Sequence, residues 1–210
     1  LRFMDLFSCN DSNKPELLFY TQKNILFKKP IFRLNPEEFI VFNKKHLIDG
    51  IYENLFAHLE SNHKTKKILL RRRDEYVEAK TLEMFIDFFG KQAKIYYNYC
   101  LIDNAEQDII VFYKNNILIV EVKAGKSREP LRDPIKAYDR IKGDFNKTIQ
   151  SASKQAKRAE DYINETNTLH LKTIKGEPID TVTISKNTVV YTILVTLERY
   201  GQVQTDLSLL

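Results

Sequence analysis

The chain has 210 residues, of which 43% are hydrophobic and 29% charged, and its formal net charge is +5 at pH 7. This composition supports the core of one domain with at most a small addition, and no run approaches the roughly 18 apolar residues that span a bilayer. The two cysteines and four histidines lack the spacing of a disulfide framework or a zinc site, and the basic surplus permits nucleic acid as a partner without indicating it. The N-terminus has no basic region followed by an apolar block, so we expect no signal peptide and a cytoplasmic location.

Residues 1–74 predict a small α+β addition that packs on the core. Residues 17–34 suggest two short strands. Asn35, followed by Pro36 and two glutamates, is typical of a helix start, because a capping side chain, an early proline and early carboxylates all favour that end. Apolar residues at helical spacing predict a helix over 44–60, and a basic connector follows it.

Residues 75–210 predict an α/β core. Its expected elements, in chain order, are an amphipathic helix (75–90), an aromatic-rich strand (93–100), two buried strands (109–113 and 117–120), a short helix starting at 133–134, a long helix (144–165) and a last buried strand (188–198). The order is helix, strand, strand, strand, helix, strand.

Three charged residues interrupt the ends of the two buried strands: Asp108, Glu121 and Lys123. Asn115 and Asn116 tolerate the left-handed backbone of a two-residue hairpin turn, and this turn would place Asp108 opposite Lys123. A turn at Lys114–Asn115 would also leave the three charged residues on one face, because side chains two apart in a strand share a face. Either turn therefore gathers an Asp, a Glu and a Lys at one end of a strand pair.

Such a cluster is costly to bury unless its members are paired, hydrogen-bonded or bound to metal. Two neighbouring carboxylates repel each other unless a divalent cation lies between them, and hard oxygen ligands suit Mg²⁺ or Mn²⁺. A bound metal lowers the pKa of a water that attacks phosphorus, and Lys123 would stabilise the hydroxide or the developing charge. The alternative is a structural salt-bridge cluster.

The segments "EQD" (106–108) and "EVK" (121–123) resemble the signature of the restriction-endonuclease-like, PD-(D/E)XK, nuclease superfamily. The similarity covers residues 75–198, with Gln107 where the family often has proline, and is nearest to the resolvase-like and RecB-like branch. It implies an αβββαβ core with a mixed central sheet flanked by helices. It also implies metal ligation by Asp108, Glu121 and the Val122 carbonyl, with Lys123 as the third catalytic residue.

The resemblance implies further positions outside the hairpin. A glutamate on the first core helix commonly assists the metal, and Glu83 fits that place best, with Glu78 as the runner-up. Gln155 is a possible supporting residue on the later helix, and Glu106 a possible further ligand. Six basic residues follow the motif and are candidates for contacting phosphates: Lys126, Arg128, Arg132, Lys136, Arg140 and Lys142.

These features predict a nuclease that depends on Mg²⁺ or Mn²⁺ and hydrolyses phosphodiester bonds in nucleic acid, DNA before RNA. The alternatives are a catalytically inactive nucleic-acid-binding or interaction domain of the same fold and an RNA-cleaving relative. A homodimer and a part of a larger protein are both left open, because no motif in the first eighty residues decides between them.

Overall fold

The computed structural model describes residues 2–10, 24–102, 105–125 and 133–197. The chain forms two compact units, Leu1–Arg71 and Arg72–Leu210. No helix among the described residues is long and apolar enough to cross a membrane.

The first unit combines a small sheet with helices. Strand β2 pairs in parallel with β1 and antiparallel with β3, which gives the order β1-β2-β3. Its elements are α1 (Arg2–Phe7), β1 (Ser8–Cys9), a 3₁₀ turn (Ile25–Phe27), β2 (Ile31–Arg33), β3 (Phe39–Val41) and α2 (Lys44–Glu60). Helix α2 confirms the expected helix, and the Asn43 side chain caps it by accepting a hydrogen bond from the Lys45 N–H, 2.9 Å away.

Two predictions for this region are wrong. Asn35 starts no helix: it lies in the turn between β2 and β3, where its Oδ1 accepts hydrogen bonds from the N–H groups of Glu37 and Glu38 at 3.0 and 2.9 Å. The same side-chain bonds that cap a helix also close a turn, so the sequence pattern could not separate the two outcomes. The expected basic connector is helical, because α3 (His63–Phe89) begins at His63. Of the strands expected over 17–34, the part over 17–23 lies outside the described residues.

The second unit is built on a mixed six-stranded sheet with the order β8-β7-β4-β5-β6-β9, in which β6 and β9 are parallel and the other pairs antiparallel. The strands are β4 (Lys94–Cys100), β5 (Glu106–Tyr113), β6 (Asn116–Lys123), β7 (Thr168–Lys172), β8 (Pro178–Thr183) and β9 (Val189–Thr196). The mixed sheet flanked by helices confirms the α/β prediction. The sequence reasoning missed β7 and β8, which are short and largely polar.

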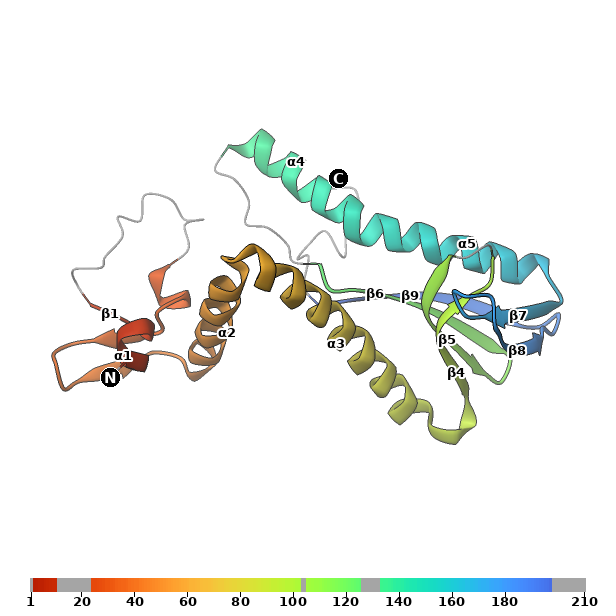
Figure 1. The fold of residues 1–210 in the computed structure, drawn as a ribbon, viewed down its shortest axis with the longest axis horizontal. Coiled ribbons are helices and arrows are strands. Elements are labelled where there is room, and N and C mark those ends of the chain that lie inside the picture. The colour runs from red at the N-terminus through yellow and green to blue at the C-terminus, as the bar shows by residue number, and fades with distance from the viewer. Residues whose placement is uncertain (1, 11–23, 103–104, 126–132, 198–210) are drawn as a thin grey trace. The chain divides into compact units, whose positions relative to one another are not determined.

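Helices cover both faces of this sheet (Figure 1). On one face, Ala156, Ala159 and Ile163 of α5 (Ser151–Glu165) pack against alternate residues of β5 and β6, such as Ile110 and Ile119. On the other face, α3 contributes Val77 and Phe85 to a cluster with Ile109, Val111, Val120 and Val122. Strand alternation thus divides the core into an α5 face and an α3 face.

The short helix expected from residues 133–134 forms, and the long helix expected over 144–165 is not regular throughout. Asp133 caps α4 (Pro134–Phe145) by accepting from the Lys136 N–H at 2.9 Å, as its sequence predicts. A π-helical segment (Asn146–Gln150) then joins α4 to α5. At this segment, Thr148 approaches the chain that leaves β6 so closely that a Cβ on Gly125 would lie 2.6 Å from its Cγ2.

Candidate functional site

The turn between β5 and β6 decides which charged residues face each other. Tyr113 pairs with Asn116, so the turn residues are Lys114 and Asn115, and Lys114 takes the left-handed conformation with φ 53°. The first of the two turns considered, Asn115–Asn116, is therefore wrong and the second is right. The ladder between the strands ends at the pair Ile109 and Val120, immediately before Asp108 and Glu121.

Beyond that pair, the Asp108 side chain joins the two strands. Its Oδ2 accepts a hydrogen bond from the Val122 N–H at 2.6 Å. The Lys123 ammonium lies 3.3 Å from Glu121 Oε2 and 3.8 Å from Asp108 Oδ2. The structure therefore brings Asp108, Glu121 and Lys123 together, while the Val122 side chain packs into the α3-face core.

Of the three charged residues, Glu121 occupies the environment that is least favourable for a charge. It continues the alternation of Ile117 and Ile119 on the α5 face and is 1% exposed. Burial, and after it the negative charge of Asp108, raise the pKa of Glu121 to about 7, although the nearby Lys123 acts in the opposite direction. Its second oxygen, Oε1, is buried without a hydrogen-bond partner among the described residues. Lys123 therefore does not fully compensate the buried carboxylate.

The two glutamates considered on the first core helix differ in position. Glu83 is exposed and its Oε2 lies 2.6 Å from the Lys80 ammonium on the surface of α3. Glu78 borders a cavity of about 210 Å³ that Asp108 also lines. Burial and then the charges of Asp108 and Asp74 raise the pKa of Glu78. The structure thus places Glu78, the runner-up, beside the cluster.

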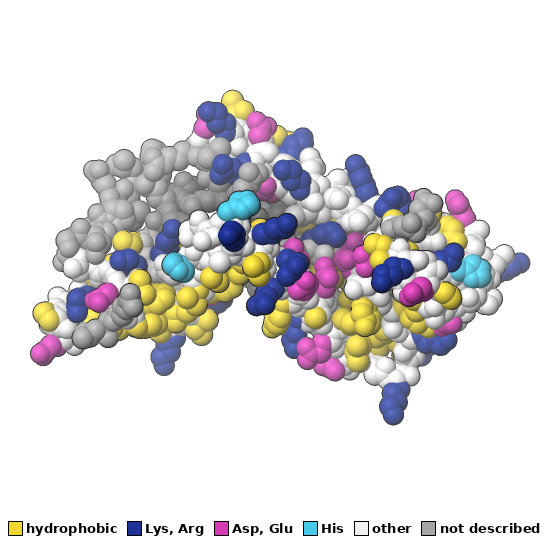
Figure 2. All heavy atoms as spheres, viewed as in Figure 1, with side chains coloured by type: hydrophobic (Ala, Val, Ile, Leu, Met, Phe, Trp, Pro, Cys, Tyr) yellow, Lys and Arg dark blue, Asp and Glu magenta, His cyan; other side chains and the backbone are white. Residues whose placement is uncertain are grey.

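The remaining predicted residues are more dispersed. Gln155 is half-buried on α5 and its side chain makes no hydrogen bond with a described residue, and Glu106 is exposed at the start of β5. On α4, the basic Lys136, Arg140 and Lys142 alternate with Asp139 and Asp144. Figure 2 shows such mixed basic and acidic side chains along this helix. The candidate phosphate-contacting residues Lys126, Arg128 and Arg132 lie outside the described residues.

Sequence reasoning overlooked Asn98 and Tyr99. Asn98 has φ 49°, between the ladder pairs Tyr97–Ile109 and Tyr99–Gln107, so the backbone of β4 is left-handed opposite Asp108. This conformation lets Tyr99 enter the α5-face core, which Tyr96 also contacts, although regular alternation would send residues three apart to opposite faces. Only the tolerance of asparagine for positive φ signalled it.

The carboxylate oxygens of Asp108 and Glu121 suit a hard cation, but they are few. Among the described residues, no group of three or more His, Cys, Asp or Glu side chains is arranged to hold a metal ion. Asp108 and Glu121 nevertheless share one ammonium contact, and Glu121 Oε1 has no described partner. Additional positive charge near these carboxylates would lower the cost of ionising Glu121. Two carboxylates completed by water are typical of Mg²⁺ sites.

Comparisons of the chain with protein-family models, with curated proteins and with solved structures found no match. The resemblance to the nuclease superfamily therefore depends on the motif and the arrangement around it.

Proposed function

We propose that this chain is a metal-dependent nuclease that hydrolyses phosphodiester bonds in nucleic acid, with DNA as the first candidate substrate. The observation that carries the proposal is the contact of one lysine with two carboxylates: the Lys123 ammonium lies 3.3 Å from Glu121 Oε2 and 3.8 Å from Asp108 Oδ2. An aspartate, a glutamate and a lysine that converge at the end of a strand pair provide two oxygen ligands and one cation for phosphoryl chemistry.

The electrostatics favour a functional site over a structural salt-bridge cluster. A cluster that stabilised the fold through ion pairing would favour the charged form of its acids, whereas the pKa of Glu121 is raised to about 7 by burial and by Asp108. Groups with strongly perturbed pKa values beside a cavity are concentrated at functional sites. Here the cavity beside Asp108 is also lined by Glu78.

Each residue would have a separate role. Asp108 and Glu121 would hold the cation, with the Val122 carbonyl and Glu78 completing or assisting its shell. When bound, Mg²⁺ or Mn²⁺ supplies a water of lowered pKa and neutralises charge on the phosphate. Lys123 would orient that water or stabilise the negative charge that develops on the phosphoryl oxygens. The hydrogen bond from the Val122 N–H fixes one Asp108 oxygen, so the carboxylate is oriented before substrate arrives.

The substrate assignment depends on charge. Nucleic-acid affinity comes mainly from phosphate neutralisation, and the formal net charge of +5 permits a polyanion as the substrate. Helix α4 alone is a mixed surface, because Asp139 and Asp144 lie among its basic residues. The chemistry acts on phosphate and not on the sugar, so RNA is the second candidate.

The test is cleavage of supercoiled plasmid, linear duplex DNA, single-stranded DNA and RNA in Mg²⁺, in Mn²⁺ and in EDTA. We expect activity that requires metal and falls about 100-fold or more in Lys123→Ala. The matched control is Lys94→Ala, which removes another sheet lysine in a carboxylate pair, 3.4 Å from Asp180. Equal activity of the Lys123→Ala variant and the wild type would contradict the proposal. Nucleic-acid binding without cleavage in any metal would favour the inactive binding domain.

A further inference from the structure

The cavity beside Asp108 has a lining that metal binding alone does not explain. It has a volume of about 210 Å³ and is formed by helix α3 and strands β4 and β5 within the second unit. Metal ligation accounts for acidic residues in this lining but not for apolar and aromatic ones. The residues that matter here are Glu78, Ala79 and Leu82 of α3, Tyr97 of β4, and Asp108 and Ile109 of β5.

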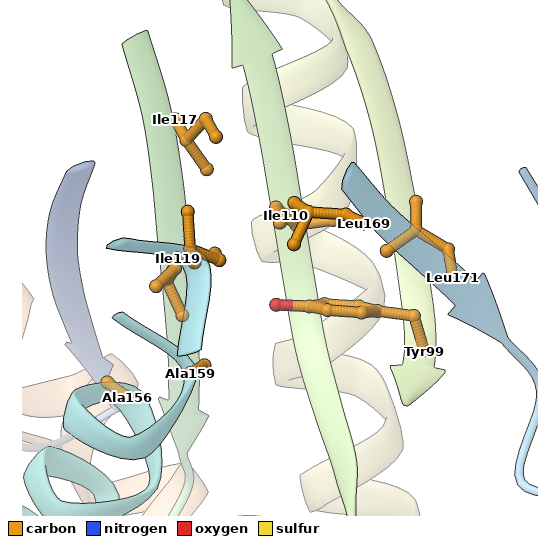
Figure 3. Packing of buried hydrophobic residues seen from close by; sticks show 9 residues of the cluster. Tyr99, Ile110, Ile117, Ile119, Ala156, Ala159, Leu169 and Leu171 are labelled. Atoms are coloured by element: carbon orange, nitrogen blue, oxygen red, sulfur yellow. The ribbon is translucent and has the colours of Figure 1, made fainter. Parts of the chain in front are cut away.

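Tyr97 presents an aromatic ring at this cavity. The residue is 59% exposed, and its side chain makes no hydrogen bond or ring contact with a described residue. Regular alternation would place it on the same face as Tyr99, but the left-handed Asn98 between them separates the two rings. Figure 3 shows Tyr99 among the apolar residues of the α5-face core, whereas Tyr97 pairs with Ile109 of the α3-face cluster. The irregular backbone therefore buries one tyrosine and leaves the other at the cavity.

The charge of the lining decides which part of a nucleic acid suits the cavity. A phosphate that entered without a cation would be repelled by the carboxylates of Glu78 and Asp108. An uncharged planar base suits it better, because Leu82 and Ile109 provide apolar contacts and Tyr97 provides a face for stacking. The carboxylates can also accept hydrogen bonds from the N–H groups on the edge of a base. Pockets for drug-sized ligands have volumes of roughly 300–1,000 Å³, so this smaller cavity suits a single base.

Resting on the proposed nuclease function, we propose that this cavity binds one unpaired nucleobase of the substrate, stacked on Tyr97, beside the phosphodiester that the cluster holds. A base within a duplex has both faces stacked and its edge paired, so it enters such a cavity only from a single strand or after leaving the helix. The preferred substrate class is therefore nucleic acid with an unpaired base next to the cleaved bond, in single strands, frayed ends or mismatched positions, before continuous duplex.

The first measurement is binding in EDTA, which needs no nuclease activity. Fluorescence anisotropy would compare a short single-stranded oligonucleotide with a blunt duplex of the same sequence. Tyr97→Ala should weaken single-strand binding about 10-fold, the effect typical of losing one base–aromatic stack, while Tyr97→Phe keeps the ring and stays within about 2-fold of the wild type. Duplex binding should be unchanged in both variants. The matched control is Tyr191→Ala, because Tyr191 is 52% exposed on β9 of the same sheet and does not line this cavity.

A second variant tests the cavity itself. Ala79 is exposed on α3 and lines the cavity, so Ala79→Leu reduces the space for a base while Tyr97 remains in place. We expect single-strand binding to fall about 10-fold here as well, again without a change in duplex binding. Single-strand affinity that is unchanged in Tyr97→Ala, or that falls equally for single strand and duplex, would overturn the proposal. So would unchanged binding by Ala79→Leu, because the tyrosine would then act outside the cavity.

Cleavage assays separate this proposal from the nuclease function. If the wild type cleaves no substrate with any metal but both variants lose single-strand binding, the base site is supported and the nuclease is refuted. If the wild type shows metal-dependent cleavage and its preference between single strand and duplex is the same in Tyr97→Ala, the base site is refuted and the nuclease is supported.

Discussion

The buried carboxylate of Glu121 should make the stability of the second unit depend on pH. Its folded-state pKa is about 7 against an ordinary value of 4.5, because burial and the charge of Asp108 disfavour ionisation. The folded protein therefore binds this proton more tightly than the unfolded chain does. Stability is highest with respect to this group below pH 4.5 and falls as the pH rises through about 7. At about 1.4 kcal/mol per pH unit, the whole loss is about 3.5 kcal/mol.

The perturbation is Glu121→Gln, a neutral replacement of nearly equal volume. We expect the free energy of unfolding of the wild type, relative to that of the variant, to fall by about 2.5 kcal/mol between pH 5 and pH 8 in EDTA. Urea unfolding followed by circular dichroism measures this quantity. Contributions from titrating groups away from the cluster, and any separate transition of the first unit, are common to both proteins and cancel in the difference.

A divalent cation provides the second half of this test. If Glu121 binds Mg²⁺, millimolar Mg²⁺ at pH 8 should restore much of the lost stability in the wild type and little in Glu121→Gln, because a ligand stabilises only a state that binds it. Parallel pH profiles of the two proteins in EDTA would refute the argument that Glu121 is ionised at a cost. Equal stabilisation of both by Mg²⁺ would show that the cation binds elsewhere.

Three further predictions concern the surroundings of the cluster. Glu78→Gln should weaken Mn²⁺ binding in a titration whereas Glu83→Gln should not, because only the first borders the cavity with Asp108. In urea unfolding, Asn98→Gly should keep full stability while Asn98→Val loses about 1–2 kcal/mol, because its backbone has φ 49°. Gly125→Ala should cost about 1–3 kcal/mol by overpacking, and adding Thr148→Ser should recover most of it, since that removes only the methyl group that the new Cβ would meet at 2.6 Å. Failure of the serine to rescue would contradict this contact.

The sequence predicted those parts of the fold in which one physical signal dominates. Apolar residues at helical spacing predicted helix α2. Continuous apolar runs with charged residues at their ends predicted the buried strands β5 and β6. The grouping of Asp108, Glu121 and Lys123 was predictable because side-chain alternation holds for either turn register. The register itself was not, because Lys114 and not an asparagine takes the left-handed position.

Other parts of the fold and the site could not be predicted, because the same residues fit two alternative structures and the sequence does not decide between them. Asn35 can accept the same hydrogen bonds in a helix cap or in a turn, and here the pairing of β2 with β3 decided the outcome. Glu83 and Glu78 lie on one helix, and only the packing of α3 on the sheet shows which of them lies beside Asp108. Tyr99 follows the left-handed Asn98, so simple strand alternation does not give the face on which it lies.

The place where the β5–β6 ladder ends explains why a site can exist there at all. Beyond Ile109 and Val120 the backbone pairing stops, and the Asp108 carboxylate takes the place of a backbone acceptor for the Val122 N–H. This hydrogen bond fixes the Asp108 carboxylate through Oδ2 and leaves Oδ1 available for a ligand. Where the β5–β6 pairing ends, the Lys123 ammonium lies near both the Asp108 and the Glu121 carboxylates, while Glu121 is only 1% exposed. Strands β5 and β6 therefore hold the three charged side chains in position. The folded state becomes less stable at alkaline pH whenever no cation offsets the charge of Glu121.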